Sequence, residues 1–281
     1  MIRIKGHSGC AIEIVDGVKS GWAIRKSSVD PSYVPRLQAQ CEKQRSFIAS
    51  GSISAPTVHS RKISIDTFSF DMAYFNGHDF LTFLEVCEKE DLDQATLSIL
   101  DFLRKNTCES TWGAFPLDQF HKKIFETQDI LRQRNDLDSI KIKECVDYLY
   151  EFRSRASFPF GYCHGDLTLS NILTSKEGAE LVFIDFLDTF IDSPVQDYVK
   201  LRQDTQLYWS TMLYQGAADF TKMKIALEYM DNKIEEAADE LGIRCFYEPF
   251  QILSLLRILK YTFDKKVINF IYNSIDKIIR N

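Results

Sequence analysis

The sequence predicts an α+β protein of two lobes: residues 1–75 form a small antiparallel β-sheet with one helix, and residues 76–281 form a larger, mostly helical lobe. Two observations lead to this prediction. The early residues contain short β-rich runs, whereas beyond Asn76 apolar residues recur at helical spacings of three and four. A chain of 281 residues, 45% of them hydrophobic, is also long enough to bury a large core in two lobes.

The amino-terminal lobe is expected to begin with a β-hairpin. The runs CAIEIV and WAIRK flank DGVKSG, whose glycines tolerate positive φ. Residues 35–50 follow with apolar side chains on one helical stripe, and Gly51 stands where a helix is expected to stop. From Phe68 to Tyr74 apolar and polar residues alternate, which predicts a strand with one buried face.

The carboxyl-terminal lobe has one break in its helical pattern. Residues 171–175 and 180–186 flank the turn KEGA and predict a second, small hairpin. After it, Ser193 can cap a helix that begins at Pro194, and Gln196 completes a capping box. Apolar spacings predict the remaining helices over 91–105, 121–133, 139–154 and most of the chain from residue 219 onward.

Charge and cysteine content argue against several classes of protein. A net charge of −6 and a pI near 5.5 give no overall field that would gather nucleic acid or anionic lipid. Seven cysteines without a CxxC pair predict reduced thiols rather than a disulfide framework or a zinc site. The sequence shows no apolar leader and no run long enough to cross a bilayer, so we expect a cytoplasmic protein without membrane insertion.

Three polar residues bracket the second hairpin. Asp166 and Asn171 precede its first strand, and Asp185 ends its second. Antiparallel strands joined by a tight turn bring their far ends side by side, so Asn171 and Asp185 should face one another. One amide oxygen and one carboxylate suit Mg²⁺, which completes its shell with water and phosphate oxygens. Asp166 is then left to accept a proton from an incoming hydroxyl as the catalytic base.

These motifs resemble a known family. HGDLTLSN, residues 164–171, followed by FIDF, residues 183–186, is similar to the H-x-D-x-x-x-x-N and I-D-[FW] signatures of the aminoglycoside phosphotransferase and choline kinase superfamily. GHSGCAIEIV, AIRK and MAYFNGHDF look like the family's phosphate-covering loop, lysine strand and interlobe linker, in the same order along the chain. The resemblance implies a protein kinase-like two-lobe fold and covers nearly the whole chain.

The resemblance also implies where a nucleotide binds. Backbone amides around Gly6, Ser8 and Gly9 would cover its phosphates. Main-chain groups near Ala73 and Phe75, in the linker, would bind the adenine.

Lys26 is expected to hold the α and β phosphates. The resemblance implies that Glu42, on the early helix, pairs with this lysine. Arg25 remains an alternative phosphate contact, and because strand neighbours point to opposite faces, the two cannot share the role. His164 is expected to shape the loop rather than to act as a base.

The implied activity is Mg²⁺-dependent transfer of the γ-phosphate of ATP or GTP to a hydroxyl of a small acceptor. Phe186 and Leu187 follow Asp185 where protein kinases carry a glycine, which argues against protein substrates. Residues 187–210 should line the acceptor cleft, and their mixture of charges and aromatic rings favours a sugar, an amino sugar or a related polyol. The acceptor-binding candidates are Asp188, Arg202, Asp204, Tyr208 and Trp209.

Other functions remain open from the sequence. One is a nucleotide-binding pseudokinase with a regulatory role, and another is a choline- or ethanolamine-type amino-alcohol kinase. A phosphoesterase that uses HGD as metal ligands would need further histidine clusters, and the five histidines of this chain show no such spacing.

Overall fold

The computed structural model describes residues 2–4, 10–17, 21–175, 180–214 and 219–280. The chain divides into two compact units. Unit 1 comprises residues 1–102, 164–188 and 210–226, and unit 2 comprises residues 103–163, 189–209 and 227–281. The lobe boundary at residues 75 and 76 stays a prediction.

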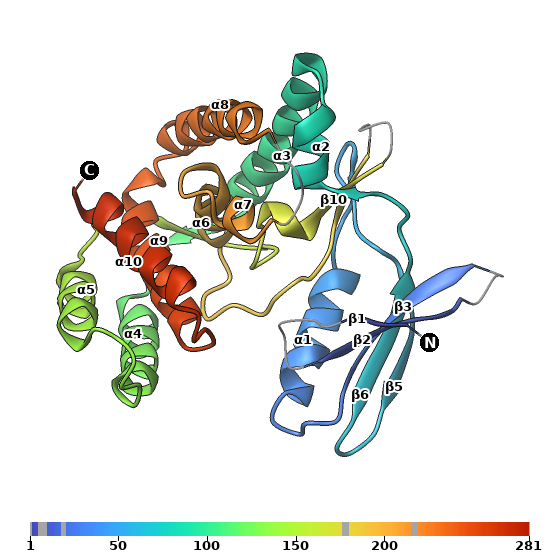
Figure 1. The fold of residues 1–281 in the computed structure, drawn as a ribbon, viewed down its shortest axis with the longest axis horizontal. Helices are drawn as coiled ribbons and strands as arrows, with labels where there is room; N and C mark the ends of the chain where they lie inside the picture. Colours follow the sequence, from blue (N-terminus) through green and yellow to red (C-terminus); the bar gives the residue numbers. More distant parts are fainter. Residues whose placement is uncertain (1, 5–9, 18–20, 176–179, 215–218, 281) are drawn as a thin grey trace. The chain divides into compact units, whose positions relative to one another are not determined.

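A five-stranded sheet forms the amino-terminal part of unit 1, with antiparallel pairing between all neighbours (Figure 1). The predicted first hairpin is confirmed, because β2 (Ala11–Asp16) pairs with β3 (Trp22–Ser28). The alternating run forms β6 (Phe68–Ala73), as predicted. β1 (Ile2–Ile4) and β5 (Val58–Ile63) complete the sheet as its edge strands.

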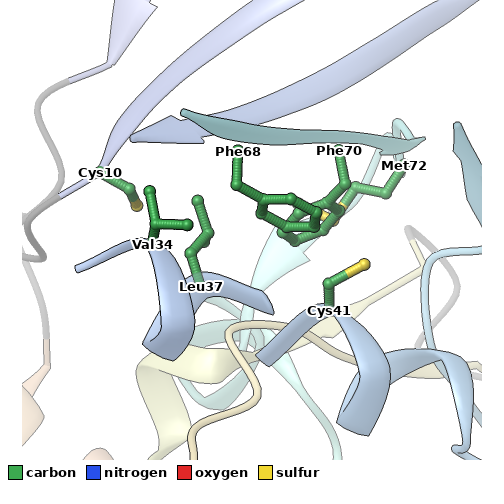
Figure 2. Packing of buried hydrophobic residues seen from close by; sticks show 7 residues of the cluster. All are labelled: Cys10, Val34, Leu37, Cys41, Phe68, Phe70 and Met72. Atoms are coloured by element: carbon green, nitrogen blue, oxygen red, sulfur yellow. The ribbon is translucent and has the colours of Figure 1, made fainter. Parts of the chain in front are cut away.

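The early helix α1 (Val34–Arg45) packs on this sheet and ends five residues before the predicted end of its apolar stripe. Leu37 and Cys41 lie one turn apart, so both side chains point to the sheet. Strand β6 presents alternate residues to the same side. Figure 2 shows how these side chains meet, in a cluster made of Cys10, Val34, Leu37, Cys41, Phe68, Phe70 and Met72.

A second sheet of unit 1 carries the predicted second hairpin. β10 (Ile172–Thr174) pairs with β11 (Leu181–Phe183) in antiparallel register, which confirms that prediction. Two strands that the sequence patterns do not predict, β4 (Ile53–Ser54) and β7 (His78–Asp79), extend the sheet on either side. Helices α2 (Phe80–Val86) and α3 (Lys89–Cys108) follow.

Unit 2 is mainly helical. Its helices are α4 (Leu117–Arg132), α5 (Ser139–Glu151), α6 (Pro194–Thr205), α9 (Tyr247–Leu259) and α10 (Lys265–Arg280), and it also contains most of α8 (Phe220–Glu240). β8 (Thr111–Gly113) pairs with β9 (Phe158–Phe160) in a two-stranded antiparallel sheet, with α4 and α5 between the two strands in the sequence. Helix α7 (Trp209–Leu213) begins where the sequence passes from unit 2 to unit 1. Phenylalanine rings that stack or meet edge-on pack together inside unit 2, among them Phe115, Phe120, Phe158, Phe246 and Phe250.

The start of α6 agrees with its predicted cap in part. Ser193 Oγ accepts a hydrogen bond from the Val195 backbone N–H at 3.2 Å, as an N-cap should. Gln196 does not close the capping box: its Oε1 accepts no hydrogen bond from the Ser193 N–H, and its Nε2 donates to the Ile191 carbonyl at 3.4 Å. Among the described residues, no helix combines the length and apolar composition that a membrane crossing requires.

Candidate functional site

Asp185 follows strand β11 in unit 1, and its carboxylate accepts a hydrogen bond from the Lys26 ammonium. Lys26 reaches it from β3, with a side chain that is only 6% exposed. The Asp185 side chain is 41% exposed and keeps access to solvent. The backbone of Asp185 is left-handed, with φ of 62°, a conformation that costs free energy for any residue other than glycine. Such strain is typical of functional sites.

Arg25, the alternative to Lys26, lies on the other face of the sheet. Its guanidinium donates two hydrogen bonds to Asp71, at 2.7 and 2.8 Å, from the position directly opposite on β6. Ser60 donates a third to the same carboxylate at 3.0 Å. The bond from Arg25 lowers the pKa of Asp71 and raises that of Arg25. Arg25 is therefore occupied by a cross-strand ion pair.

The loop before β10 brings Asp166 and Asn171 together. Asn171 Nδ2 donates to the Asp166 carbonyl at 2.8 Å and to its carboxylate at 3.2 Å. The Asn171 carbonyl accepts the Ile184 N–H at 3.0 Å, which extends the hairpin ladder up to the residue before Asp185. Because Nδ2 faces Asp166, Oδ1 is the Asn171 atom that can face a cation.

His164 is fully buried and forms hydrogen bonds both to the loop that carries Asp166 and to the segment that carries Asp185. Its Nε2 hydrogen-bonds to the Ile184 carbonyl at 2.8 Å, and its Nδ1 accepts the Asp166 N–H at 3.3 Å. Its carbonyl accepts the Leu187 N–H at 3.0 Å, and its ring lies 4.3 Å from that of Phe186. Burial lowers the pKa of His164 to about 4, so the ring is neutral at pH 7 with its proton on Nε2.

The predicted pairing of Glu42 with Lys26 is absent from the structure. The Glu42 side chain is 54% exposed and binds Arg61 and Arg45, the latter at 2.7 Å. The reason is helical geometry: α1 buries Cys41, and the next residue points about 100° away.

Two cations of α1 bind the segment after Asp185 instead. Lys43 Nζ donates to the Leu187 carbonyl at 2.9 Å, and Arg36 Nε donates to Asp188 at 3.0 Å. These contacts were not predicted from the sequence. The only available signal was their spacing of seven residues, which places them on one helix face.

The linker after β6 comes close to the second hairpin. A Cβ added at Gly77 would meet the Thr174 carbonyl at 2.2 Å and the Phe75 ring at 2.3 Å, so this approach needs glycine. The backbone N–H of Ala73 is bonded to Thr57. Of the predicted phosphate loop, Gly6, Ser8 and Gly9 lie outside the described residues, whereas Cys10 belongs to the core under the sheet.

The acceptor-binding candidates are spread over both units. Asp188 is in unit 1, bound to Arg36, and the other four are in unit 2. Arg202 is buried, with its guanidinium 2.9 Å from Glu235 and 3.1 Å from Asp231.

Asp204 is 1% exposed. The Tyr208 hydroxyl bonds to Glu228 at 3.2 Å, and the Trp209 ring lies 5.8 Å from that of Phe270. Arg202 and Asp204 are thus interior groups of unit 2, and the structure does not present them to a ligand.

Comparisons with known proteins show similarity in sequence and in fold. Residues 94–221, which include Asp166, Asn171 and Asp185, match the model of the phosphotransferase enzyme family. The fold is that of the aminoglycoside phosphotransferase and choline kinase superfamily. The resemblance predicted from the sequence is confirmed. No curated protein matches the sequence significantly.

Several solved structures share this fold at low sequence identity. The aminoglycoside phosphotransferase APH(3'')-Id of Streptomyces rimosus is 17% identical, with a TM-score of 0.58 over 91% of this chain and 92% of that one. Ethanolamine kinase of Plasmodium vivax is 14% identical, with a TM-score of 0.56 over 99% and 81%. APH(2")-IIIa, solved with GDP and kanamycin, is 15% identical, with a TM-score of 0.53 over 96% and 93%.

Proposed function

We propose that the protein is a Mg²⁺-dependent kinase that transfers the γ-phosphate of ATP or GTP to a hydroxyl of a small acceptor. One observation carries the proposal: a single unit of the fold gathers Lys26, Asp166, Asn171 and Asp185 through short backbone and side-chain contacts. These are the groups that phosphoryl transfer requires to position phosphates, a cation and a nucleophile. The same groups argue against a pseudokinase.

Each residue has a distinct role in this proposal. The Lys26 ammonium binds phosphate oxygens, and it rests on Asp185 when no nucleotide is bound. Asp166 orients the acceptor hydroxyl and takes its proton. Asn171 holds the Asp166 carboxylate in place through Nδ2. His164 stays neutral and fixes the loop, because both its ring nitrogens are used by the backbone.

The donor set fits a magnesium ion. The described residues contain no group of three His, Cys, Asp or Glu side chains arranged for a metal, so a cation here would rest on few protein ligands. Asn171 Oδ1 and the Asp185 carboxylate are hard oxygen donors, and Mg²⁺ prefers such a pair with water and phosphate oxygens. Bound there, the ion would neutralise charge on the transferred phosphoryl group.

The acceptor we propose is a sugar, an amino sugar or a related polyol. The superfamily fold supports a small acceptor, since neighbours were solved with streptomycin and ADP or with kanamycin and GDP. Ala73, Phe75 and the loop of Gly6, Ser8 and Gly9 are proposed nucleotide contacts. Asp188, Tyr208 and Trp209 remain proposed acceptor contacts.

The test is a transfer assay with purified protein, Mg²⁺, and ATP or GTP against a panel of sugars, aminoglycosides, amino alcohols and polyol acids. We expect nucleoside diphosphate release above background with one acceptor class, and a phosphomonoester visible by phosphorus NMR. Binding of ATP with no transfer to any alcohol of the panel would identify a pseudokinase instead. Transfer to choline or ethanolamine alone would identify an amino-alcohol kinase.

A further inference from the structure

One side of helix α1 contacts the segment that carries Asp185. Arg36 and Lys43 lie on this helix, and Phe47 follows directly after its cap residue. A spacing of seven residues places Arg36 and Lys43 on the same side of the helix, and Phe47 comes about one turn later. Other residues of α1 pack on the five-stranded sheet. The helix therefore contacts two different parts of unit 1.

The first contact with this segment is aromatic. The Phe47 ring meets the rings of Phe183 and Phe186 edge-on, with ring centres 6.3 and 5.5 Å away. Phe183 is 0% exposed and Phe186 is 1% exposed, so both rings are fixed by packing. They stand two residues before Asp185 and one residue after it. Packing on Phe47 thus holds the chain on both sides of the aspartate.

The second contact is polar and involves the peptide groups after Asp185. The half-buried Lys43 donates to the Leu187 carbonyl at 2.9 Å, and the Leu187 N–H donates to the His164 carbonyl at 3.0 Å. Both backbone groups of Leu187 are therefore bound. A charged donor makes a stronger hydrogen bond than a neutral one. The neighbouring pair of Arg36 and Asp188 is 35% and 45% exposed, so Lys43 is the more important of the two cations.

These contacts bear on the orientation of the Asp185 carboxylate. Its backbone is left-handed, with φ of 62°, and such a conformation persists only where the surrounding structure maintains it. Glu42 was expected to link α1 to Lys26, but its carboxylate binds arginines instead. Lys43, one residue later, links the same helix to the Asp185 segment. In this way α1 joins the sheet that carries Lys26 to the segment whose carboxylate binds it.

We propose that Lys43 is a positioning residue for Asp185, the proposed magnesium ligand. By binding the Leu187 carbonyl, the Lys43 ammonium holds Asp185 in the orientation in which its carboxylate can take a cation and the phosphates that the cation carries. Lys43 itself touches neither the metal nor the nucleotide in this role. The part of the proposal that concerns the metal rests on the proposed kinase function.

The first experiment measures hydrogen exchange in the protein without metal or nucleotide. Peptides that cover residues 184–189 are compared in the wild type, Lys43→Met, Lys43→Arg and Arg45→Met. Arg45→Met is the control, since it removes a cation of the same helix that is 42% exposed.

We expect the Leu187 amide to exchange at least about tenfold faster in Lys43→Met, a factor that corresponds to about 1.4 kcal/mol. Arg45→Met should match the wild type, and Lys43→Arg, which keeps a charged donor, should lie closer to the wild type than Lys43→Met does. Exchange in the β2–β3 hairpin should not change, which separates a local release from a general loss of stability. Equal exchange of residues 184–189 in all variants would overturn the proposal.

The second experiment measures ADP binding by calorimetry with and without Mg²⁺. In Lys43→Met the affinity for ADP with Mg²⁺ should fall about tenfold, the lower end of what is lost when a group that orients a metal ligand is removed. The affinity for ADP without metal should stay at the wild-type value. An equal loss with and without Mg²⁺ would show that Lys43 acts on the phosphates through its charge alone, and would overturn the positioning role.

The outcomes separate this role from the kinase function. A wild type that binds ADP with Mg²⁺ in a Lys43-dependent way but transfers phosphate to no acceptor would support the positioning role and count against the kinase. Phosphate transfer by the wild type, with metal-dependent ADP binding unchanged in Lys43→Met, would overturn the positioning role alone. A wild type that binds no ADP would overturn both.

Discussion

Replacing His164 by phenylalanine should lower the free energy of unfolding, and this loss should be largest at neutral pH. The substitution also removes the pH dependence of stability that comes from the titration of His164. A phenylalanine ring keeps the packing against Phe186 but removes both nitrogens. The Ile184 carbonyl and the Asp166 N–H then lose their partners. An unsatisfied buried polar group costs about 1–3 kcal/mol, so the two together should lower the free energy of unfolding by about 2–6 kcal/mol at pH 7.

The pH dependence follows from the lowered pKa of the wild-type ring. His164 has a pKa of about 4 in the folded protein, and a free histidine titrates near about 6.5. Above pH 6.5 the His164 ring is neutral in both the folded and the unfolded protein. As the pH falls from 6.5 to 4, His164 becomes protonated in the unfolded chain but stays neutral in the folded protein. The free energy of unfolding therefore decreases over this pH range. The loss amounts to about 3 kcal/mol, at about 1.4 kcal/mol per pH unit.

The measurement is urea unfolding of both proteins at pH 7.0 and pH 4.5. The difference in free energy of unfolding between wild type and His164→Phe should shrink by about 2–3 kcal/mol at the lower pH. His59 lies exposed on the edge strand β5, and His59→Phe should stay within about 0.5 kcal/mol of wild type at both values. A difference for His164→Phe that is the same at both pH values would refute the neutral, buried histidine.

Five further variants test the residues of the site and one partly buried lysine of unit 2. Asp166→Ala should lower kcat by about two to four orders of magnitude while calorimetry still detects nucleotide binding. Lys26→Met should weaken nucleotide binding, and Arg25→Met should leave nucleotide affinity unchanged because Arg25 faces Asp71; calorimetry compares the two directly. Glu42→Ala should keep kcat/KM within about twofold of wild type, since its partners are exposed arginines. Lys260→Met should raise the free energy of unfolding at pH 7 by about 1 kcal/mol in urea titrations, a value reduced for the partial exposure of this lysine.

The elements that the sequence predicts correctly depend on local patterns. The hairpin of β2 and β3, the alternation in β6 and the hairpin of β10 and β11 each follow from residues close together in the chain. Strand β4 differs, because Ile53 and Ser54 pair in parallel with β11, more than a hundred residues later. Two-residue strands formed by such distant pairing leave no periodic signal.

The site shows the same division between local and distant causes. Asp166, Asn171 and Asp185 lie close together in the sequence around one hairpin, and this local pattern predicts that they are neighbours in unit 1. Glu42 was assigned by family position, but its direction depends on how α1 is rotated against the sheet, which Cys41 and its neighbours decide through packing. Arg202 is also positioned by distant residues, since the carboxylates that form ion pairs with it come from α8.

The backbone at Asp185 explains why this site can be assembled without a glycine after the aspartate. Asp185 takes the left-handed conformation itself, and three neighbouring contacts maintain it. The Ile184 carbonyl is bound by the His164 ring, the Leu187 N–H by the His164 carbonyl, and the Leu187 carbonyl by Lys43. Because hydrogen bonds on both sides fix the peptide units around Asp185, a backbone flip would break several of them at once. We therefore expect the carboxylate to keep one orientation with and without nucleotide, which suits an enzyme that needs no activation step.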